Sequence, residues 1–260
     1  MKVVILAGGL GSRLAEETGQ RPKPMVEIGG RPILWHIMKL YGHHGLNDFV
    51  VCLGYKGFMI KEYFANMQLH DCDVTVDLAQ SSISYHNSVR EPWRVTLVDT
   101  GPSTMTGGRL KRVADWLPPD EPFCLTYGDG VADVDLSALV AFHRAHGRQA
   151  TITAVAPPGR YGALDLAPGD VIERFVEKPP GDNALINGGF FVLDPSVVAR
   201  IADDDTPWEA EPLEGLAREG QLVAFRHSGF WAAMDTLRDR NTLEALWAGG
   251  TAPWAVWDRP

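Results

Sequence analysis

A glycine-rich loop that directly follows an apolar run is the part of the sequence best suited to hold a phosphorylated ligand. Residues 3–7 form the apolar run and residues 8–11 the loop, and Arg13 and Lys23 come after it. Glycines let backbone N–H groups approach a triphosphate or a base closely, and the two cations add positive charge. The loop therefore predicts a nucleotide site. Its expected residues are Leu6, Ala7, Gly8, Gly9, Leu10, Gly11, Ser12, Arg13 and Lys23.

These glycines do not fit two familiar nucleotide-binding loops. A Rossmann dinucleotide loop has the pattern G-x-G-x-x-G, whereas the run that begins at Gly9 ends in Leu14. A P-loop needs Gly-Lys followed by Ser or Thr, which this loop does not contain. An NAD-dependent oxidoreductase is therefore disfavoured, and a tight turn without a ligand stays open as the simplest alternative.

Two aspartates are candidate ligands for Mg²⁺. Asp129 follows the apolar run 123–127, and open α/β sheets bind their ligands at the carboxyl ends of strands. Asp235 is the best second carboxylate, and Mg²⁺ needs only one or two carboxylates beside phosphate oxygens and water. Each has a structural alternative. The Asp-Gly pair at 129–130 favours a type I′ hairpin turn, and Asp235 could cap a helix that begins at Thr236.

A third group of polar residues lies in the second half of the chain. Lys178 stands in a Glu-Lys-Pro segment at 177–179, and lysine is a compact cation for a phosphate. Glu177 and Asn187 carry side chains that can hydrogen-bond hydroxyl groups. Glu-Lys-Pro alone is a weak motif and more often a surface turn, so it indicates a phosphate site only in combination with the other motifs.

The order of apolar segments predicts the elements that must position these residues. Strand-like runs at 3–7 and 49–53 alternate with helical patterns at 32–45 and 57–67, which indicates parallel βαβ units. Further strands are expected at 74–78, 94–98, 123–127 and 151–155, with a polar connection at 80–91 and helices at 107–117 and 135–146.

From residue 157 onward, glycines and prolines interrupt short strand-like runs, which indicates a second lobe. We predict an α/β fold with a Rossmann-like, mostly parallel sheet flanked by helices and a smaller mixed β-rich lobe that binds sugar. The expected boundaries are 1–156 for the nucleotide-binding lobe, 157–235 for the sugar-phosphate-binding lobe and 236–260 for a C-terminal helix and tail. All three would form one compact unit.

Composition restricts the partners and the compartment. The net charge of −9 argues against binding nucleic acid, because phosphate backbones are held by basic surfaces. Three cysteines suggest no disulfide framework, and neither a signal peptide nor an apolar stretch long enough to span a membrane is visible. We therefore expect a cytoplasmic protein without membrane or nucleic-acid partners.

The glycine loop with its Arg and Lys-Pro, the Glu-Lys-Pro segment and the Asn-Gly-Gly segment at 187–189 together resemble the sugar-1-phosphate nucleotidylyltransferase family over essentially the whole chain. The resemblance implies a Mg²⁺-dependent enzyme with Asp129 and Asp235 as metal ligands. The catalytic residues implied are Arg13, Lys23, Asp129 and Lys178. The sugar-phosphate residues implied are Tyr127, Gly162, Glu177, Lys178, Asn187 and Gly188. Thr104, Arg109 and Gly128 are added to the nucleotide site.

Three segments resemble the branch of this family that uses CTP and glucose 1-phosphate, at 27–38, 92–101 and 105–112. An arginine fork at Arg109 would favour cytosine, because cytosine N3 accepts a hydrogen bond whereas uracil and thymine carry a hydrogen there. The alternative is an exposed basic helix face that Arg109 shares with Lys111 and Arg112.

The reaction expected from the resemblance is an in-line attack of the sugar phosphate on the α-phosphorus of the triphosphate, with loss of pyrophosphate. Arg13 and Lys23 would stabilise the leaving group, and Lys178 would aim the nucleophile. Another base or another phosphorylated acceptor stays open, as does a nucleotide-binding regulatory protein without turnover. The branch forms homo-oligomers, and the tryptophan-rich tail at 252–257 is compatible with one.

Overall fold

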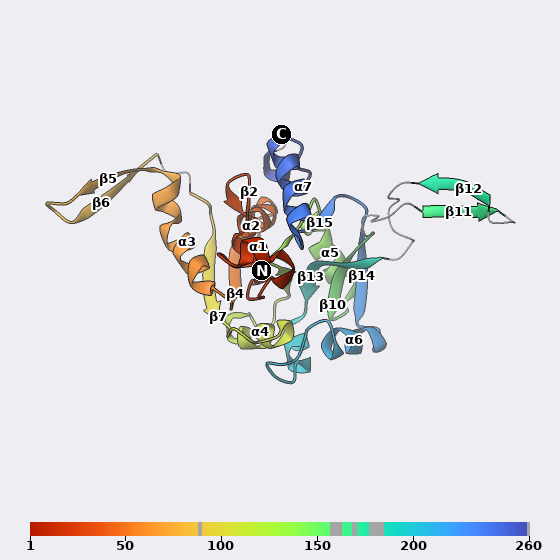
Figure 1. The fold of residues 1–260 in the computed structure, drawn as a ribbon. Helices are drawn as coiled ribbons and strands as arrows, with labels where there is room; N and C mark the ends of the chain where they lie inside the picture. Colours follow the sequence, from red (N-terminus) through yellow and green to blue (C-terminus); the bar gives the residue numbers. More distant parts are fainter. Residues whose placement is uncertain (88–89, 157–162, 168–170, 177–184, 259–260) are drawn as a thin grey trace.

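A seven-stranded sheet with the strand order β14-β10-β13-β8-β1-β4-β7 is the centre of the computed structural model (Figure 1). Its strands are β1 (Lys2–Leu6), β4 (Asp48–Leu53), β7 (Arg94–Asp99), β8 (Phe123–Tyr127), β10 (Ala150–Val155), β13 (Ile186–Leu193) and β14 (Leu222–His227). Strand β13 runs antiparallel to β8 and β10, and the other pairs are parallel. The predicted α/β fold with a mostly parallel sheet is confirmed. The structure describes residues 1–87, 90–156, 163–167, 171–176 and 185–258.

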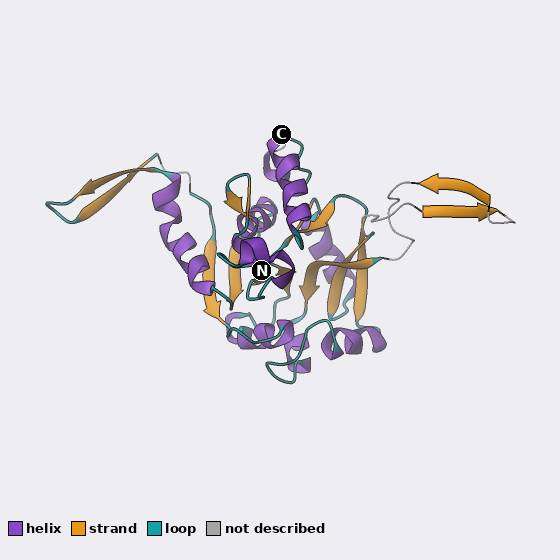
Figure 2. Ribbon diagram, viewed as in Figure 1, coloured by secondary structure: helices purple, strands orange, loops and turns teal. Residues whose placement is uncertain are grey.

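Helices cover both faces of this sheet (Figure 2). One face packs against α2 (Ile33–His43), α3 (Gly57–Asp71), α5 (Leu136–His146) and α7 (Leu237–Ala248), and the other against α4 (Thr106–Arg112) and α6 (Glu211–Arg218). Alternate residues of β1 enter the two cores, Val3 and Ile5 on the first face and Val4 and Leu6 on the second. Burial on both faces explains why the first strand reads as an unbroken apolar run.

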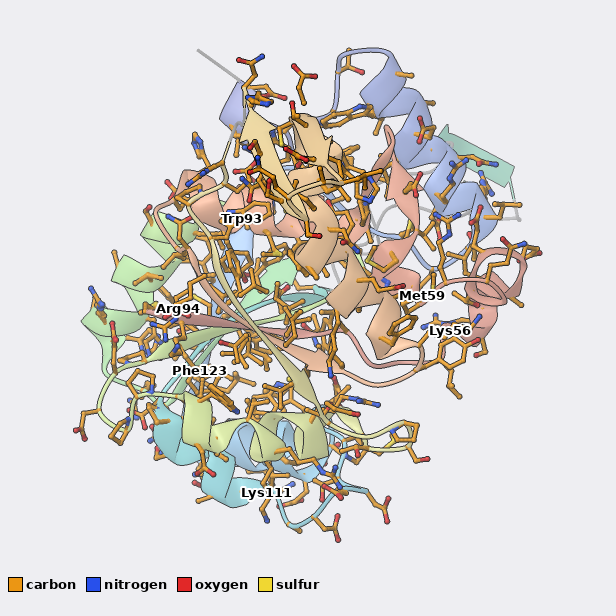
Figure 3. The ribbon with its side chains drawn as sticks, turned by 90° about the vertical axis from the view of Figure 1, so that its left-hand side faces the viewer. Lys56, Met59, Trp93, Arg94, Lys111 and Phe123 are labelled. Atoms are coloured by element: carbon orange, nitrogen blue, oxygen red, sulfur yellow. The ribbon has the colours of Figure 1, made fainter. Side chains whose placement is uncertain are left out.

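Phe123 illustrates the second core. Its side chain is fully buried between the sheet and α4, whereas Lys111 lies on the outer side of the same helix (Figure 3).

The remaining described elements are short helices and two-stranded pairs. The helices are α1 (Ala15–Thr18) and 3-10 helices at Ser12–Leu14, Lys23–Met25, Ala114–Trp116, Pro195–Arg200 and Val256–Asp258. The strand pairs are β2 (Glu27–Ile28) with β3 (Arg31–Pro32), β9 (Gly130–Ala132) with β15 (Trp231–Ala233), β5 (Asp73–Asp77) with β6 (Ser82–His86), and β11 (Ala163–Ala167) with β12 (Val171–Val176).

A hairpin extends from the end of α3 and lies away from the central sheet (Figure 1). The expected strand at 74–78 is present as β5. The polar connection expected at 80–91 is wrong for residues 82–86, which form β6 and pair with β5. In β6, apolar Ile83 and Tyr85 alternate with serine, and so short an alternation is easily read as loop.

The second half of the chain returns to the central sheet. Strands β13 and β14 both pair with β10, so residues 186–227 share a sheet with the expected nucleotide-binding lobe. Sequence patterns missed α6 and β14. The lobe boundaries at 156 and 235 stay predictions.

The C-terminal tail folds back onto α2. Trp254 is buried, stacks on Phe230 with ring centroids 5.6 Å apart, and donates its indole N–H to His36 Nδ1 over 3.3 Å. Among the described residues, none of the helices combines the length and the apolar character needed to cross a bilayer.

Candidate active site

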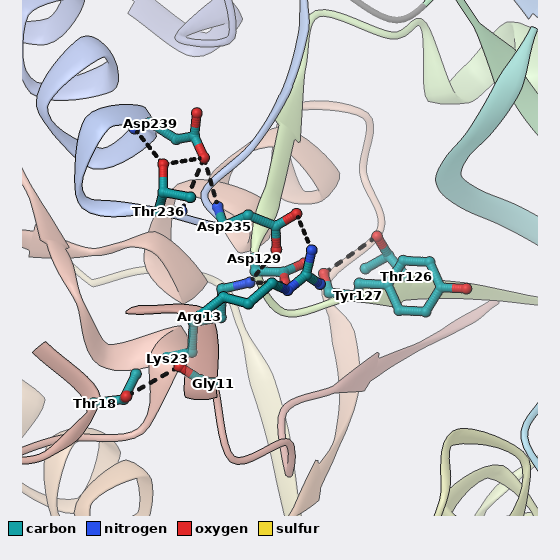
Figure 4. Close-up of polar contacts among 10 residues, drawn as sticks. All are labelled: Gly11, Arg13, Thr18, Lys23, Thr126, Tyr127, Asp129, Asp235, Thr236 and Asp239. Atoms are coloured by element: carbon teal, nitrogen blue, oxygen red, sulfur yellow. Dashed lines mark hydrogen bonds and ion pairs between the residues drawn. The ribbon is translucent and has the colours of Figure 1, made fainter. Parts of the chain in front are cut away.

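Two aspartates and two cations converge beside the carboxyl end of β1 (Figure 4). Lys23 Nζ lies 2.6 Å from Asp129 Oδ2 and 2.8 Å from Asp235 Oδ1. Arg13 donates from the other side to Asp235 Oδ2 over 3.1 Å. Burial alone would lower the pKa of Lys23, but the two carboxylates more than offset it, so the net shift of the pKa is upward. Lys23 is therefore held as an ammonium ion.

Backbone pairing brings the two aspartates together although they are far apart in the sequence. Strands β9 and β15 pair antiparallel, with Gly130 opposite Ala233, and the Met234 N–H donates to the Asp129 carbonyl over 2.9 Å. Each aspartate thus stands just beyond a paired strand end, and their carboxylates face the same cation.

The structural alternatives for the two aspartates are both wrong. Strand β8 pairs with β1 and β13 while β9 pairs with β15, so Asp129 is not the tip of a β8–β9 hairpin. The cap of α7 is Thr236, whose side chain and that of Asp239 form a capping box. Asp235 lies one residue before this cap, and its carboxylate is directed to Lys23 and Arg13 (Figure 4).

A cavity of about 350 Å³ opens beside these groups. It is lined by Leu6, Ala7, Gly8, Gly9, Gly11, Ser12, Arg13, Lys23, Pro24, Thr104, Met105, Thr106, Arg109, Tyr127, Gly128 and Asp129. Sequence reasoning named most of this lining but missed Pro24, Met105 and Thr106. Leu10, which we expected in the nucleotide site, is 62% exposed and does not line the cavity.

Gly8 leaves room for the guanidinium of Arg109. A Cβ atom on Gly8 would lie 2.1 Å from Arg109 Nη1, so a larger residue would force the guanidinium to shift. Gly11 has φ +64°, and its carbonyl accepts a hydrogen bond from the Thr18 hydroxyl over 3.1 Å. The loop is therefore shaped by contacts from α1 and α4.

Arg109 is buried, which contradicts the alternative of an exposed basic helix face. Burial lowers the pKa of its guanidinium. Its guanidinium donates to four backbone carbonyls and to one side-chain hydroxyl. The acceptors are Leu53 O at 3.0 Å, Thr100 Oγ1 at 2.8 Å, Gly101 O at 2.8 Å, Gly8 O at 3.1 Å and Pro102 O at 3.4 Å. Arg109 ties the glycine loop to the ends of β4 and β7, and any base contact would have to replace part of this set.

The expected sugar side is only partly within the described residues. Gly162, Glu177 and Lys178 lie outside them. Asn187 Nδ2 donates to Tyr127 Oη over 3.1 Å, and the Gly188 carbonyl accepts from Trp231 Nε1 over 2.7 Å. The structure thus places Asn187 next to Tyr127, and Gly188 next to β15, which ends two residues before Asp235.

The donor set suits one hard cation. The two carboxylates already share a cationic partner in Lys23, and carboxylates are the protein ligands that Mg²⁺ takes beside phosphate oxygens. Among the described residues, no group of three or more His, Cys, Asp or Glu side chains is arranged to hold a metal by itself. A metal here would complete its coordination with water or with the nucleotide.

Comparisons with known proteins identify the family. A model of the nucleotidyl transferase family matches residues 2–231. A glucose-1-phosphate cytidylyltransferase of Salmonella typhimurium is 62% identical over 258 residues, which cover 99% of this chain and 100% of that protein. A mannose-1-phosphate guanyltransferase of Saccharomyces cerevisiae is 33% identical over 247 residues, covering 92% of this chain and 62% of that protein.

A solved structure shares the fold. HddC from Yersinia pseudotuberculosis superposes with a TM-score of 0.69 at 24% identity, covering 95% of this chain and 99% of that chain. The family model spans most of the chain, and the Salmonella relative matches nearly all of it. The chain therefore belongs to the nucleotidyl transferase family.

Proposed function

We propose that this protein transfers the cytidylyl group of CTP to α-D-glucose 1-phosphate, giving CDP-glucose and pyrophosphate. The observation that carries the proposal is Lys23 held between Asp129 and Asp235 at the mouth of the glycine-loop cavity. The 62% identity to a glucose-1-phosphate cytidylyltransferase supports the choice of base and sugar.

The reaction is a single displacement at the α-phosphorus of CTP. An oxygen of the sugar phosphate forms the new bond to phosphorus as the bond to the bridging oxygen of pyrophosphate breaks. No protein nucleophile is needed, so catalysis rests on alignment of the two phosphates and on neutralising charge.

The cations of the site supply that neutralisation. Lys23 is held as an ammonium by its neighbours, and Arg13, whose side chain is 74% exposed, stands at the open side of the cavity. We assign both to the leaving pyrophosphate. Lys178 would aim the sugar phosphate, and Gly162 and Glu177 would complete the sugar pocket with Tyr127, Asn187 and Gly188.

Mg²⁺ is the cofactor that the proposal requires, with Asp129 and Asp235 as its protein ligands. When bound, the ion would hold and neutralise phosphate oxygens of the two substrates. Glycine-loop N–H groups and the side chains of Thr104 and Arg109 would hold the nucleotide. Gly128 would contribute by lying close to the end of β1, since a Cβ atom there would be 3.0 Å from the Leu6 carbonyl oxygen.

Two further properties belong to the proposal. The described cysteines form no disulfide, which fits the proposal of a cytoplasmic enzyme. Self-association is supported by the β5–β6 hairpin, on which Val74, Val76, Ile83 and Tyr85 occupy one face as cross-strand pairs and are all exposed. A two-stranded ribbon is at best marginally stable in water, so a second copy of the chain is the proposed cover of this face.

The test is pyrophosphate release from glucose 1-phosphate and Mg²⁺ with CTP, UTP, dTTP, ATP or GTP in separate reactions. Turnover confined to CTP, with CDP-glucose identified by mass, is the expected result. Turnover with UTP or dTTP instead would keep the mechanism and reject the base. Binding of nucleotides without turnover on any acceptor would favour the regulatory alternative.

A further inference from the structure

Glu209 connects two sides of the cavity that belong to different parts of the chain. Its Oε1 accepts a hydrogen bond from the Tyr127 hydroxyl over 2.6 Å, and its Oε2 accepts one from the Thr106 hydroxyl, also over 2.6 Å. Thr106 begins α4, Tyr127 ends β8, and both line the cavity. Glu209 itself lies before α6 and is not part of the lining.

The carboxylate sets the direction of the hydrogen bonds around Tyr127. A carboxylate only accepts, so the Tyr127 hydroxyl donates to Glu209 and its oxygen is left to accept. Asn187 Nδ2 fills one acceptor position of that oxygen over 3.1 Å.

The amide of Asn187 is oriented by the same chain of contacts. Its Oδ1 accepts the Gly189 N–H over 2.8 Å, so Nδ2 faces Tyr127. Among the contacts of the described residues, one amide hydrogen of Asn187 and one acceptor position of Tyr127 are left for a ligand. Gly189, with φ +81°, leaves room for the ring, since a Cβ atom there would lie 2.7 Å from Tyr127 Cδ2. Ring and amide are thus fixed relative to each other.

We propose that Glu209 is a positioning residue for sugar recognition, which fixes Tyr127 as an acceptor and Asn187 as a donor toward a sugar hydroxyl. The inference rests on the proposed function, because it assumes that the sugar phosphate occupies the Tyr127 side of the cavity. A sugar hydroxyl that donates to Tyr127 and accepts from Asn187 matches this pair, and the hydroxyl positions of an epimer would not.

The test compares Glu209→Gln and Tyr127→Phe with the wild type, using glucose 1-phosphate, galactose 1-phosphate and CTP as varied substrates. Glu209→Gln replaces one carboxylate oxygen with an NH₂ group, which donates and does not accept, so the Thr106 and Tyr127 hydroxyls can no longer donate to separate oxygens as they do in the wild type. Tyr127→Phe keeps the ring that packs on Phe191 and removes only the hydroxyl. Glu211→Gln is the matched control, since Glu211 pairs with Arg218 on the surface and carries the same charge.

We expect each test variant to raise the KM for glucose 1-phosphate about tenfold and to narrow the preference over the galactose epimer, as loss of a charge-assisted hydrogen bond does. The KM for CTP and the melting temperature should match those of Glu211→Gln. The double variant should lose no more than one single variant, because both remove the same interaction.

Other outcomes separate the two proposals. An active wild type whose sugar KM and epimer preference survive both substitutions would overturn the role of Glu209. If only the KM for CTP rises, Glu209 acts on nucleotide binding through Thr106, and the role proposed here is equally overturned. A wild type that makes no CDP-glucose would instead reject the proposed function itself.

Discussion

The ammonium group of Lys23 lies 2.6 Å from Asp129 Oδ2, in the space between the two carboxylates that we propose as ligands of Mg²⁺. The same ammonium lies 2.8 Å from Asp235 Oδ1. Lysine and metal therefore compete for the same oxygens while no nucleotide is bound. A triphosphate offers Lys23 other anionic partners, so nucleotide and metal should bind cooperatively.

Removing the ammonium should strengthen metal binding in the absence of nucleotide. For Lys23→Met we expect the Kd for Mn²⁺, measured by electron paramagnetic resonance, to fall roughly tenfold, which corresponds to ~1.4 kcal/mol. Lys61→Met on the exposed side of α3 makes the same change of charge away from the site. Equal Mn²⁺ affinity in Lys23→Met and the control would contradict the competition.

The same substitution should damage turnover more than substrate binding. If Lys23 stabilises the leaving pyrophosphate, Lys23→Met should lower kcat by about 10²- to 10³-fold, as loss of one preorganised charge at a reacting centre does. The KM for glucose 1-phosphate should change little. Steady-state measurement of kcat and of the KM for glucose 1-phosphate tests this role. The opposite pattern, a raised KM for glucose 1-phosphate with kcat preserved, would show that Lys23 contributes to substrate binding and not to the transition state.

The site was predictable where residue types and local order carry the chemistry. The apolar run, the glycines, Arg13 and Lys23 stand close together in the sequence. The end of the run, the loop glycines and both cations line the cavity. Asp129 is predicted from its place after a strand-like run, and Asp235 is predicted as the second carboxylate. The register of β9 with β15, which brings them together, has no local signal because it depends on strands about a hundred residues apart.

Other features could not be predicted from the sequence because they depend on contacts between distant segments. Arg109 lies in a basic run that reads as a solvated helix face, yet its side chain is buried under backbone carbonyls of three loops. Glu209 stands in a segment without a motif, and only the fold places it between Thr106 and Tyr127. The strands β13 and β14 join the central sheet by pairing that periodicity alone does not reveal.

Arg109 should support the loop even if it reads no base. Arg109→Lys keeps the charge but leaves several buried carbonyls without a donor, so we expect a loss of about 2 kcal/mol in the free energy of unfolding in urea. Arg112→Lys, at an exposed ion pair with Asp204, should change stability little.

A second substitution of Arg109 tests base selection. Competition among CTP, UTP and dTTP should show a weaker preference for CTP in Arg109→Ala, assayed at a temperature where the variant is folded. A preference equal to that of the wild type would reject base reading and leave Arg109 with the loop alone.

The exposed face of the hairpin predicts the determinant of self-association. Ile83 stands opposite Val76 on the apolar face, and Ser84 points to the other face of the same strand. Ile83→Glu should therefore lower the molar mass in solution, measured by sedimentation equilibrium, whereas Ser84→Glu should leave it as in the wild type. A wild type that is already monomeric, or an unchanged mass in Ile83→Glu, would reject this face as the contact.

Stability at acid pH should depend on His36. This side chain is buried beneath the C-terminal tail, where its Nε2–H donates to Ile28 O over 2.8 Å and its Nδ1 accepts from Trp254. Burial lowers the pKa of His36 to about 4. An imidazole in the unfolded chain takes up its proton at about pH 6.5, so the unfolded state binds more protons over this interval.

The stabilisation from neutral His36 is therefore complete above about pH 6.5 and is lost as the pH falls toward 4, by ~3 kcal/mol if the full difference in pKa applies. The pKa of His143 is likewise lowered to about 4 by burial, so a second buried histidine contributes to the loss of stability over the same pH range.

The free energy of unfolding in urea, measured across this range, should depend less steeply on pH in His36→Gln than in the wild type. His43→Gln, on an exposed position of the same helix, should keep the slope of the wild type. Identical slopes in the wild type and His36→Gln would show that His36 is not the group whose protonation destabilises the fold.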